Sequence, residues 1–301
     1  MSKVIFIFLD GVGIGEDSPV NPFASSDLGI LSTLSEERLV KGICVKKENL
    51  FIKGLDACCG VDGLPQSATG QTTLFTGINA SKSIGGHISA YPTKPLKKII
   101  KEHSIFKQIS LRGLSSTFAN AYGTQYHDLI KSTNSRHSAS TLCVMAGGIE
   151  FRIEKDLLNE NAVFWDISHE VSKDSFGTSY SFREPELAGN IIASISKTHD
   201  FVMYETFLPD LVGHGKRTTL KAKRLIEEII TPFLDGIINH ISTDTTLVIC
   251  SDHGNIEDLS TKRHTRNPVP LIVYGKGSTK FHTAESIADV TPCIIDVLCE
   301  G

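Results

Sequence analysis

Acidic and histidine side chains follow apolar segments of this sequence in an order typical of a metal site. Six positions share this placement: Asp10, Asp210, His214, Asp252, His253 and His264. Carboxylate oxygens and neutral imidazole nitrogens are ligands that zinc and manganese both accept. With a serine oxygen added, the set is large enough for two divalent ions. The residue types therefore predict a centre of two metal ions, either manganese or zinc.

Ser67 is the serine that this chemistry would use. It follows the turn Gly63-Leu64-Pro65 and opens a segment, residues 67–76, that can form a short helix. A serine hydroxyl is a weak nucleophile at neutral pH, but a metal ion that holds it as the alkoxide makes it a strong one. The unpaired N–H groups at a helix start also suit a transferring phosphoryl group. We therefore expect Ser67 to be both nucleophile and metal ligand in phosphoryl transfer.

Each candidate also has an ordinary structural explanation. Asp10 could simply end a strand in a turn, and Ser67 could simply cap a helix. The loop Gly11–Gly15 could suggest a dinucleotide-binding turn, but that fingerprint requires glycine at the position of Glu16. The metal hypothesis is favoured because the candidates occur together, at the places where strands are expected to end.

Four apolar segments are expected to form the buried strands that position these residues. They are residues 4–9, 201–204, 246–250 and 269–274, and none of them alternates polar with apolar side chains. Such continuous runs are typical of strands buried on both faces. Candidate ligands follow the first three segments, and His264 precedes the fourth. Because the working groups of open α/β sheets lie just past the strand ends, we expect all of them at one edge of the sheet.

Helical patterns between these strands predict an α/β fold. The expected helices cover residues 23–39 with a break, 67–76, 96–109, 218–241 and 286–298. Alternation of strands with helices indicates a mostly parallel central sheet with helices on both faces. Residues 122–197 show a weaker and more polar pattern. We therefore expect a single metal-dependent catalytic domain over residues 1–301, with a small cap inserted at approximately 122–197.

Composition and charge exclude several other classes of protein. The chain has 301 residues and a formal net charge of -4, so no global basic field would attract nucleic acid or a membrane surface. The apolar run at 4–9 is too short for a signal peptide, and no stretch approaches the ~20 residues that span a bilayer. Seven cysteines without a C-x-x-C pair argue against a disulfide framework. We expect a cytoplasmic protein that acts on a small molecule, with its oligomeric state left open.

Four parts of the chain resemble the alkaline phosphatase superfamily, and within it cofactor-independent phosphoglycerate mutase and phosphopentomutase. The resemblance lies in residues 8–13 (FLDGVG), 67–77 (SATGQTTLFTG), 209–214 (PDLVGH), and 251–255 (SDHGN) followed by 264–270 (HTRNPVP). It implies an alkaline-phosphatase-like fold. It also implies one metal ion held by Asp10, Ser67, Asp252 and His253, and another held by Asp210, His214 and His264.

Two departures from the mutases affect the expected activity. The interval from Ser67 to Asp210 is too short for the second catalytic domain of phosphoglycerate mutase, and Gln71 stands where the mutases have histidine. Both departures favour a phosphatase or phosphodiesterase that acts through a phosphoserine intermediate. A phosphomutase and a non-catalytic metal-binding protein are the alternatives. Arg136 and His137, in the expected cap, are candidates to contact a phosphate or carboxylate of the substrate.

Overall fold

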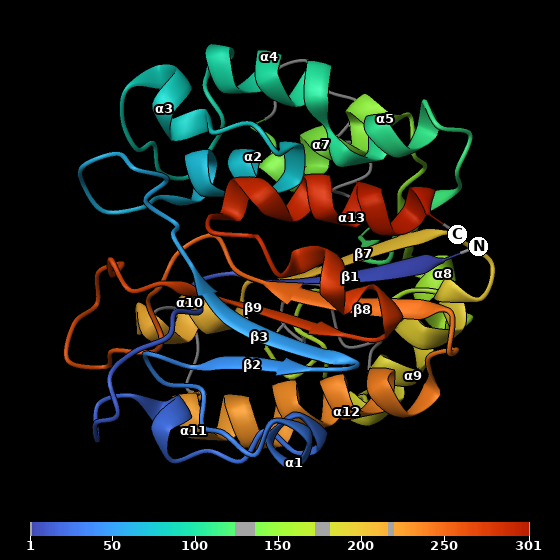
Figure 1. Ribbon diagram of the computed structural model, residues 1–301. Coiled ribbons are helices and arrows are strands. Elements are labelled where there is room, and N and C mark those ends of the chain that lie inside the picture. The colour runs from blue at the N-terminus through green and yellow to red at the C-terminus, as the bar shows by residue number, and fades with distance from the viewer. Residues whose placement is uncertain (1, 124–135, 172–180, 216–219, 301) are drawn as a thin grey trace.

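A seven-stranded mixed sheet forms the centre of the computed structural model, which describes residues 2–123, 136–171, 181–215 and 220–300 (Figure 1). Its strand order is β2-β3-β9-β8-β1-β7-β4. The strands are β1 (Lys3–Leu9), β2 (Cys44–Lys47), β3 (Leu50–Leu55), β4 (Ser116–Phe118), β7 (Phe201–Thr206), β8 (Thr245–Cys250) and β9 (Val269–Tyr274). The expected α/β class is confirmed.

The central strand β1 is apolar after its first residue because both of its faces are buried. Residues 4–8 have no exposed surface. Because successive side chains of a strand point to opposite faces, Ile5 and Ile7 pack into one hydrophobic core while Phe6 and Phe8 pack into the other. A strand that supplies both cores has no solvated face, so no polar alternation appears in its sequence.

Strand direction brings the start of β9 to the edge of the sheet where β1, β7 and β8 end. β1 pairs in parallel with β7 and β8, whereas β9 is antiparallel to β8 and to β3. In a wholly parallel sheet, a loop that precedes β9 would lie at the opposite edge. The reversed direction of β9 is therefore what carries the loop with His264 to the same edge as the other candidate ligands.

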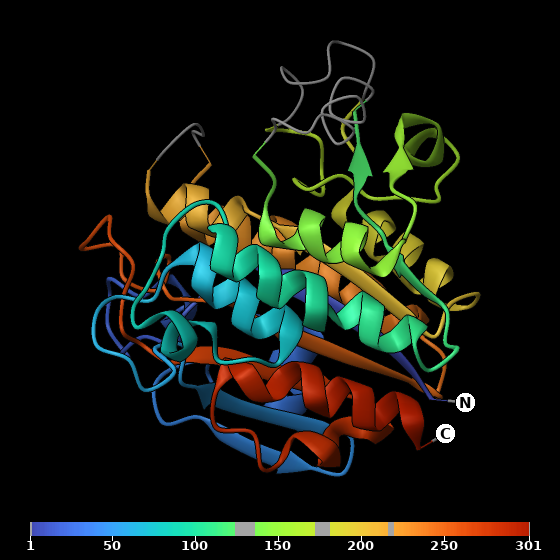
Figure 2. The same ribbon diagram turned by 90° about the horizontal axis from the view of Figure 1, so that it is seen from above.

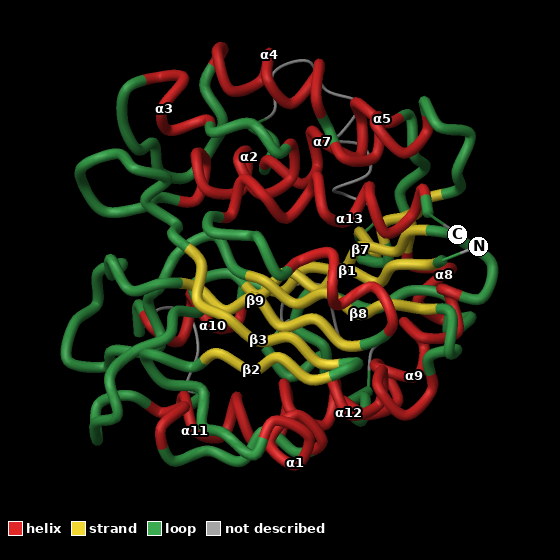
Figure 3. The backbone as a smooth tube through the Cα atoms, in the orientation of Figure 1, coloured by secondary structure: helices red, strands yellow, loops and turns green. Residues whose placement is uncertain are grey.

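Two layers of helices cover the sheet, one on each face (Figures 1 and 3). One layer contains α2 (Ser67–Thr76), α3 (Ala80–Ile84), α4 (Lys94–His103), α5 (Ile105–Ser110), α7 (Ala139–Gly147) and α13 (Val290–Cys299). The other contains α1 (Ile30–Ser35), α9 (Pro185–Ser196), α11 (Ala222–Arg224), the π-helical turn η2 (Leu225–Ile230) and α12 (Thr231–His240). None of the described helices is long and apolar enough to cross a membrane.

Short elements complete the described part of the chain. They are the 3-10 turns η1 (Pro22–Ala24), η3 (Lys276–Phe281) and η4 (Ile287–Asp289), the helices α8 (Glu154–Leu158) and α10 (Leu208–Gly213), and the strands β5 (Ala121–Tyr122) and β6 (Arg152–Ile153). β5 and β6 pair in parallel as a separate two-stranded sheet. Of these elements, α10 bears directly on the candidate site because it follows β7.

The expected cap range, residues 122–197, includes two helices that pack on the main body. α7 packs against α2, α4 and α5, and α9 packs against α12, β1 and β7. β5, β6 and α8 lie to one side of the helical layers (Figure 2). A separate cap with the expected boundaries therefore stays a prediction, and the described segment that stands apart is shorter than the one expected.

Candidate metal centre

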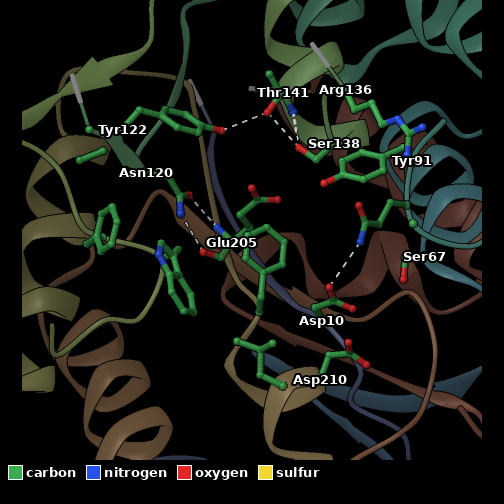
Figure 4. Close-up of a pocket in the computed structure, with 18 residues that line it drawn as sticks. Asp10, Ser67, Tyr91, Asn120, Tyr122, Arg136, Ser138, Thr141, Glu205 and Asp210 are labelled. Atoms are coloured by element: carbon green, nitrogen blue, oxygen red, sulfur yellow. Dashed lines mark hydrogen bonds between the residues drawn. The ribbon is translucent and has the colours of Figure 1, made fainter. Parts of the chain in front are cut away.

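All seven predicted site residues lie together at the edge where β1, β7 and β8 end. Asp10 follows β1, Asp210 and His214 belong to α10 and its C-terminus, Asp252 and His253 follow β8, His264 lies in the loop before β9, and Ser67 is the first residue of α2. Figure 4 shows Asp10, Ser67 and Asp210 at one end of a cavity. The structure thus brings together residues that are up to 254 positions apart in the chain.

Asp210, His214 and His264 form the first group of candidate ligands. The Nε2 atom of His214 lies 3.3 Å from Asp210 Oδ1 and 3.3 Å from His264 Nε2. Nδ1 of His214 lies 2.7 Å from the carbonyl oxygen of Lys262, and Nδ1 of His264 lies 2.9 Å from that of Pro65. Since a carbonyl only accepts, each Nδ1 carries the hydrogen in the neutral ring. Each Nε2 then turns its lone pair toward the other members of the group.

Asp10, Ser67, Asp252 and His253 form the second group. The Nε2 atom of His253 lies 3.1 Å from Ser67 Oγ, 3.4 Å from Asp10 Oδ1 and 3.5 Å from Asp252 Oδ2. The two groups adjoin, because the rings of His253 and His264 stack with centroids 3.7 Å apart. Three oxygen donors therefore lie within 3.5 Å of His253 Nε2, beside the first group.

Buried carboxylate oxygens in the second group lack hydrogen-bond partners among the described residues. This applies to both oxygens of Asp252 and to Oδ1 of Asp10. Burial, with Coulombic repulsion from Asp252 and Asp210, raises the pKa of Asp10 well above its usual value. Burial and repulsion from Asp210 raise the pKa of Asp252 to about 8. Negative charge is costly here without a counter-charge, so the donor set fits divalent cations, which would supply it.

The pKa shifts of two histidines also fit a site for divalent cations. Burial, with repulsion from His264, lowers the pKa of His253 well below its usual value. Burial also lowers the pKa of His264. Neutral imidazole is the form that ligates a metal ion. Asp210 also lies with Asp10 and His253 in a possible ligand group, so its carboxylate is placed to serve both groups.

Glu257, which no sequence pattern singles out, connects the loops of the site. Its side chain is buried and accepts hydrogen bonds from Gly13 N at 3.0 Å, Asn255 N at 2.7 Å and Asn267 Nδ2 at 3.0 Å, and also from the hydroxyl of Thr265. These donors come from the loops after β1 and β8 and from the loop before β9. The only signal in the sequence was an acid close to the Asp252-His253 pair, and burial is not visible there.

The glycine-rich loop after β1 allows close packing rather than cofactor binding. Gly11 has a φ of +74°, and a Cβ atom on it would lie 2.8 Å from the Cα of Asp210. A Cβ on Gly13 would collide with the carboxylate of Glu257. Glycine is required at these positions because the loop passes directly against two acidic residues of the site.

A cavity of about 700 Å³ opens beside the two groups. Arg136 lines it, whereas His137 lies in a neighbouring hollow of about 380 Å³ that also contains Arg136 and Lys97. Burial, together with the charge of Lys97, lowers the pKa of His137. Of the two expected substrate contacts in the cap, the structure therefore places Arg136 on the main cavity and His137 outside it.

Two further polar residues line the cavity. Gln71 Nε2 donates to Asp10 Oδ2 at 3.5 Å, one turn along α2 from Ser67. Glu205, near the end of β7, is buried and accepts a hydrogen bond from Ser140 Oγ at 2.9 Å. Burial raises the pKa of Glu205 to about 8. Glu205 follows the apolar run of residues 201–204 directly, which could have marked it as a site residue. The strand was expected to end at Tyr204, one residue before Glu205.

Comparison with known proteins places this geometry in context. A family model for the Metalloenzyme superfamily matches residues 2–299. A 2,3-bisphosphoglycerate-independent phosphoglycerate mutase of Antithamnion sp. is 31% identical over 125 residues, which are 38% of this chain and 24% of that protein. The mutase of Listeria welshimeri is 34% identical over 108 residues, which are 33% of this chain and 20% of that protein. The matches therefore cover about a quarter or less of the length of these curated relatives.

Solved structures share the fold over almost the whole chain. The PH0037 protein from Pyrococcus horikoshii has a TM-score of 0.59 at 14% identity and covers 100% of this chain and 97% of its own. The alkaline phosphatase from the Antarctic bacterium TAB5 has a TM-score of 0.55 at 16% identity and covers 99% of each chain. Phosphoglycerate mutase of Leishmania mexicana has a TM-score of 0.52 at 11% identity and covers 99% of this chain and 95% of its own. At these identities, the likeness lies in the fold.

Proposed function

Because the chain belongs to the Metalloenzyme superfamily, with its alkaline-phosphatase-like fold, we propose that it is a phosphatase or phosphodiesterase with Ser67 as nucleophile. Its substrate would be a small-molecule phosphate ester. The observation that carries the proposal is the position of Ser67 Oγ, 3.1 Å from His253 Nε2, at the first residue of α2 and on the wall of the cavity.

Two divalent ions, manganese or zinc, are part of the proposal. Asp10, Ser67, Asp252 and His253 would hold one ion, and Asp210, His214 and His264 would hold the other. Bound there, they would neutralise the acidic cluster of Asp10, Asp210 and Asp252, acidify the Ser67 hydroxyl and stabilise charge on the transferring phosphoryl group. The orphaned oxygens of Asp10 and Asp252 support this assignment, since nothing else among the described residues satisfies them.

The chain's own residues supply the two steps of the reaction. Ser67 Oγ attacks phosphorus, the bond from phosphorus to the ester oxygen breaks, and the leaving alcohol takes up a proton. Water then attacks the phosphoserine and restores the Ser67 hydroxyl, which releases inorganic phosphate when the substrate is a monoester and the remaining phosphate monoester when it is a diester. The N-terminus of α2 favours both steps, because its positive dipole end lies at the negative phosphoryl group.

Replacement of Ser67 tests the proposal. In Ser67→Ala, we expect kcat for phosphate mono- and diesters to fall by at least ~10³-fold, because the covalent route is lost. Ser110→Ala, at an exposed position of α5, is the matched control and should keep wild-type activity. Metal content of both variants is measured alongside. Wild-type turnover by Ser67→Ala at equal metal content would show that the nucleophile is another group.

A phosphomutase is the second candidate, because the curated relatives reported above are mutases. In that case, the phosphoserine would return its phosphoryl group to another hydroxyl of the substrate. Product analysis separates the two reactions: hydrolysis releases inorganic phosphate, whereas a mutase yields an isomer of the substrate. Stable metal binding without turnover of any ester would instead favour the non-catalytic alternative.

A further inference from the structure

Aromatic side chains line the cavity along with Ser67 and the acidic cluster. They are Tyr91, Tyr122, Phe164, Trp165 and Phe207. The centroid of the Trp165 ring lies 6.0 Å from that of Phe164 and 6.2 Å from that of Phe207, so three of the rings form one continuous surface. Tyr91 and Tyr122 lie on opposite sides of the cavity (Figure 4). Tyr91 is 47% exposed, so its ring can contact a bound molecule.

Few cationic side chains line this cavity. Among the described residues that line the cavity, Arg136 is the only cation, whereas Asp10, Glu205 and Asp210 are acids. A substrate with a second phosphate or a carboxylate would thus meet aromatic rings and Glu205, with a single cation to pair it. A sugar acid phosphate is therefore a poor match for this lining, and a flat uncharged group is a good one.

Strained backbone positions lie close to two of the rings. Ala90, which precedes Tyr91, has a φ of +61°, and the buried Ile167, two residues after Trp165, has a φ of +62°. A left-handed conformation costs a side-chain-bearing residue roughly 1–2 kcal/mol, and more for a β-branched one such as isoleucine. Such strain persists only where the surrounding structure fixes it.

The backbone that carries Trp165 is fixed in this way. The carbonyl oxygen of Phe164 accepts from Tyr204 Oη at 2.7 Å and from Ile167 N at 2.9 Å. Tyr204 belongs to β7 and is fully buried. The backbone next to Trp165 is therefore anchored to the central sheet.

We infer that the alcohol part of the substrate carries a planar, uncharged ring, which stacks on Trp165 and lies between Tyr91 and Tyr122 while the phosphate lies at Ser67. This inference rests on the proposed function for the phosphate end. Ring stacking should increase affinity or kcat/KM by about 10-fold or more over an ester that lacks the ring.

A binding experiment tests whether the cavity prefers a ligand that carries a ring, and it requires no turnover. Trp165 is the only tryptophan in the chain, so its fluorescence reports on the cavity directly. Zinc-loaded Ser67→Ala protein is titrated with 2-phenylethylphosphonate and with propylphosphonate, neither of which can be hydrolysed. We expect the phenyl compound to change the fluorescence and to bind at least ~10-fold more tightly. Equal affinity of the two compounds, or no binding of the phenyl compound, overturns the inference.

A kinetic experiment tests the same ring in the active enzyme. 2-Phenylethyl phosphate and propyl phosphate both release an unactivated primary alcohol, so a difference in kcat/KM reports on ring contacts and not on leaving-group reactivity. We expect a preference of ~10-fold or more for the phenyl ester, lost in Trp165→Leu and largely kept in Trp165→Phe. Phe182→Leu, at an exposed ring outside this cavity, is the control and should keep the preference.

The outcomes separate the inference from the proposed function. Equal turnover of both esters, or a preference for 3-phosphoglycerate over both, overturns the ring inference and leaves the hydrolase proposal standing. No turnover of any ester by metal-loaded wild-type protein contradicts the proposed function. In that case, the fluorescence titration alone decides whether the cavity binds a ring.

Discussion

Two backbone carbonyls decide which imidazole nitrogens of His214 and His264 face the candidate metal. Both rings turn Nδ1 to a carbonyl oxygen, of Lys262 and Pro65 respectively, and this leaves Nε2 for the site. Outer partners of this kind set the orientation and basicity of a ligating histidine. The loops that contain Lys262 and Pro65 therefore contribute to the site through their backbone, whatever side chains they carry.

Glu257 is not a candidate metal ligand. Among such residues, it is the one whose replacement should most weaken the packing of the loops that form the site. In Glu257→Gln, an NH₂ group replaces an oxygen that now faces only donors, so at least one buried hydrogen bond becomes a donor–donor contact. We expect the free energy of unfolding to fall by about 2–4 kcal/mol. Urea denaturation of the metal-free protein measures this, with the exposed Glu37→Gln as control. Equal midpoints for the two variants would show that Glu257 does not tie the loops together.

Glu205 should make the stability of the metal-free protein depend on pH. Burial raises its pKa from 4.5 to about 8, so between these values the folded chain holds a proton that the unfolded chain releases. The contribution of Glu205 to stability is therefore complete below pH 4.5 and is lost as the pH rises through about 8. Relative to Glu205→Gln, wild-type protein should lose up to about 1.4 kcal/mol per pH unit across this range. A constant difference between the two proteins from pH 5 to 8 would contradict the shift.

At the scale of the elements, α9 and α12 cross at unusually close range. A Cβ atom on Gly189 of α9 would lie 2.9 Å from Ile237 N and would collide with the carbonyl oxygen of Phe233. Gly236 of α12 meets the backbone of Glu186 in the same way. Glycine is a poor helix former, so its presence in both helices is explained by this contact.

Gly189→Ala should therefore destabilise the protein even though alanine favours helices. We expect a net loss of about 1–3 kcal/mol, because overpacking outweighs the gain of about 1 kcal/mol in helix propensity. Ser194→Ala, at an exposed position of the same helix, is the control and should be neutral or slightly stabilising. Thermal unfolding measures both variants. A gain in stability for Gly189→Ala would mean that α9 can move away from α12.

The elements also show which parts of the fold the sequence could predict. Continuous apolar runs identified β1, β7, β8 and β9, because strands buried on both faces need them. The hairpin of β2 and β3 was missed, since β2 lies at the sheet edge and three of its four side chains are exposed. Helices α7 and α9 were assigned to the cap because their packing partners are distant in sequence.

In the candidate site, too, some residues could be predicted from the sequence and others could not. Six of its candidate ligands could be found because each follows or precedes a recognisable strand, and Ser67 could be found because it opens a recognisable helix. Glu257 could not, because a buried acid and an exposed acid look identical in sequence, and only tertiary contacts distinguish them. The ring-lined wall around Trp165 was missed for a related reason: its aromatic residues come from four separate segments, and no pattern in any one of them indicates a shared surface.

At the scale of the whole molecule, the site joins segments from both ends of the chain. Three carboxylates, of Asp10, Asp210 and Asp252, repel one another there in the absence of metal. Bound ions would relieve this repulsion and connect the loops after β1, β7 and β8. Metal binding should therefore stabilise the entire fold and not the site alone.

Removal of metal tests this coupling. We expect chelation to lower the Tm by about 6 °C for each ion removed, as for an ion present at ~1,000 times its Kd. Asp252→Asn should raise the Tm of the metal-free protein at neutral pH, because the folded wild-type chain must either bury a charge or take up a proton at Asp252. It should also shrink the gain on adding zinc or manganese. Differential scanning calorimetry with and without chelator measures both effects. An unchanged Tm on chelation of metal-loaded protein would show that the acidic cluster is stable without ions.

The central position of β1 also has a kinetic consequence. Its two neighbours in the sheet are β7 and β8, so Val4 pairs with Phe201 on one side and with Thr246 on the other. During synthesis, β1 must wait for about 240 further residues before both partners exist. Pairing over such distances slows folding and leaves an apolar strand exposed to aggregation in the meantime. Chaperone dependence should therefore be strongest for nascent chains that end before β8.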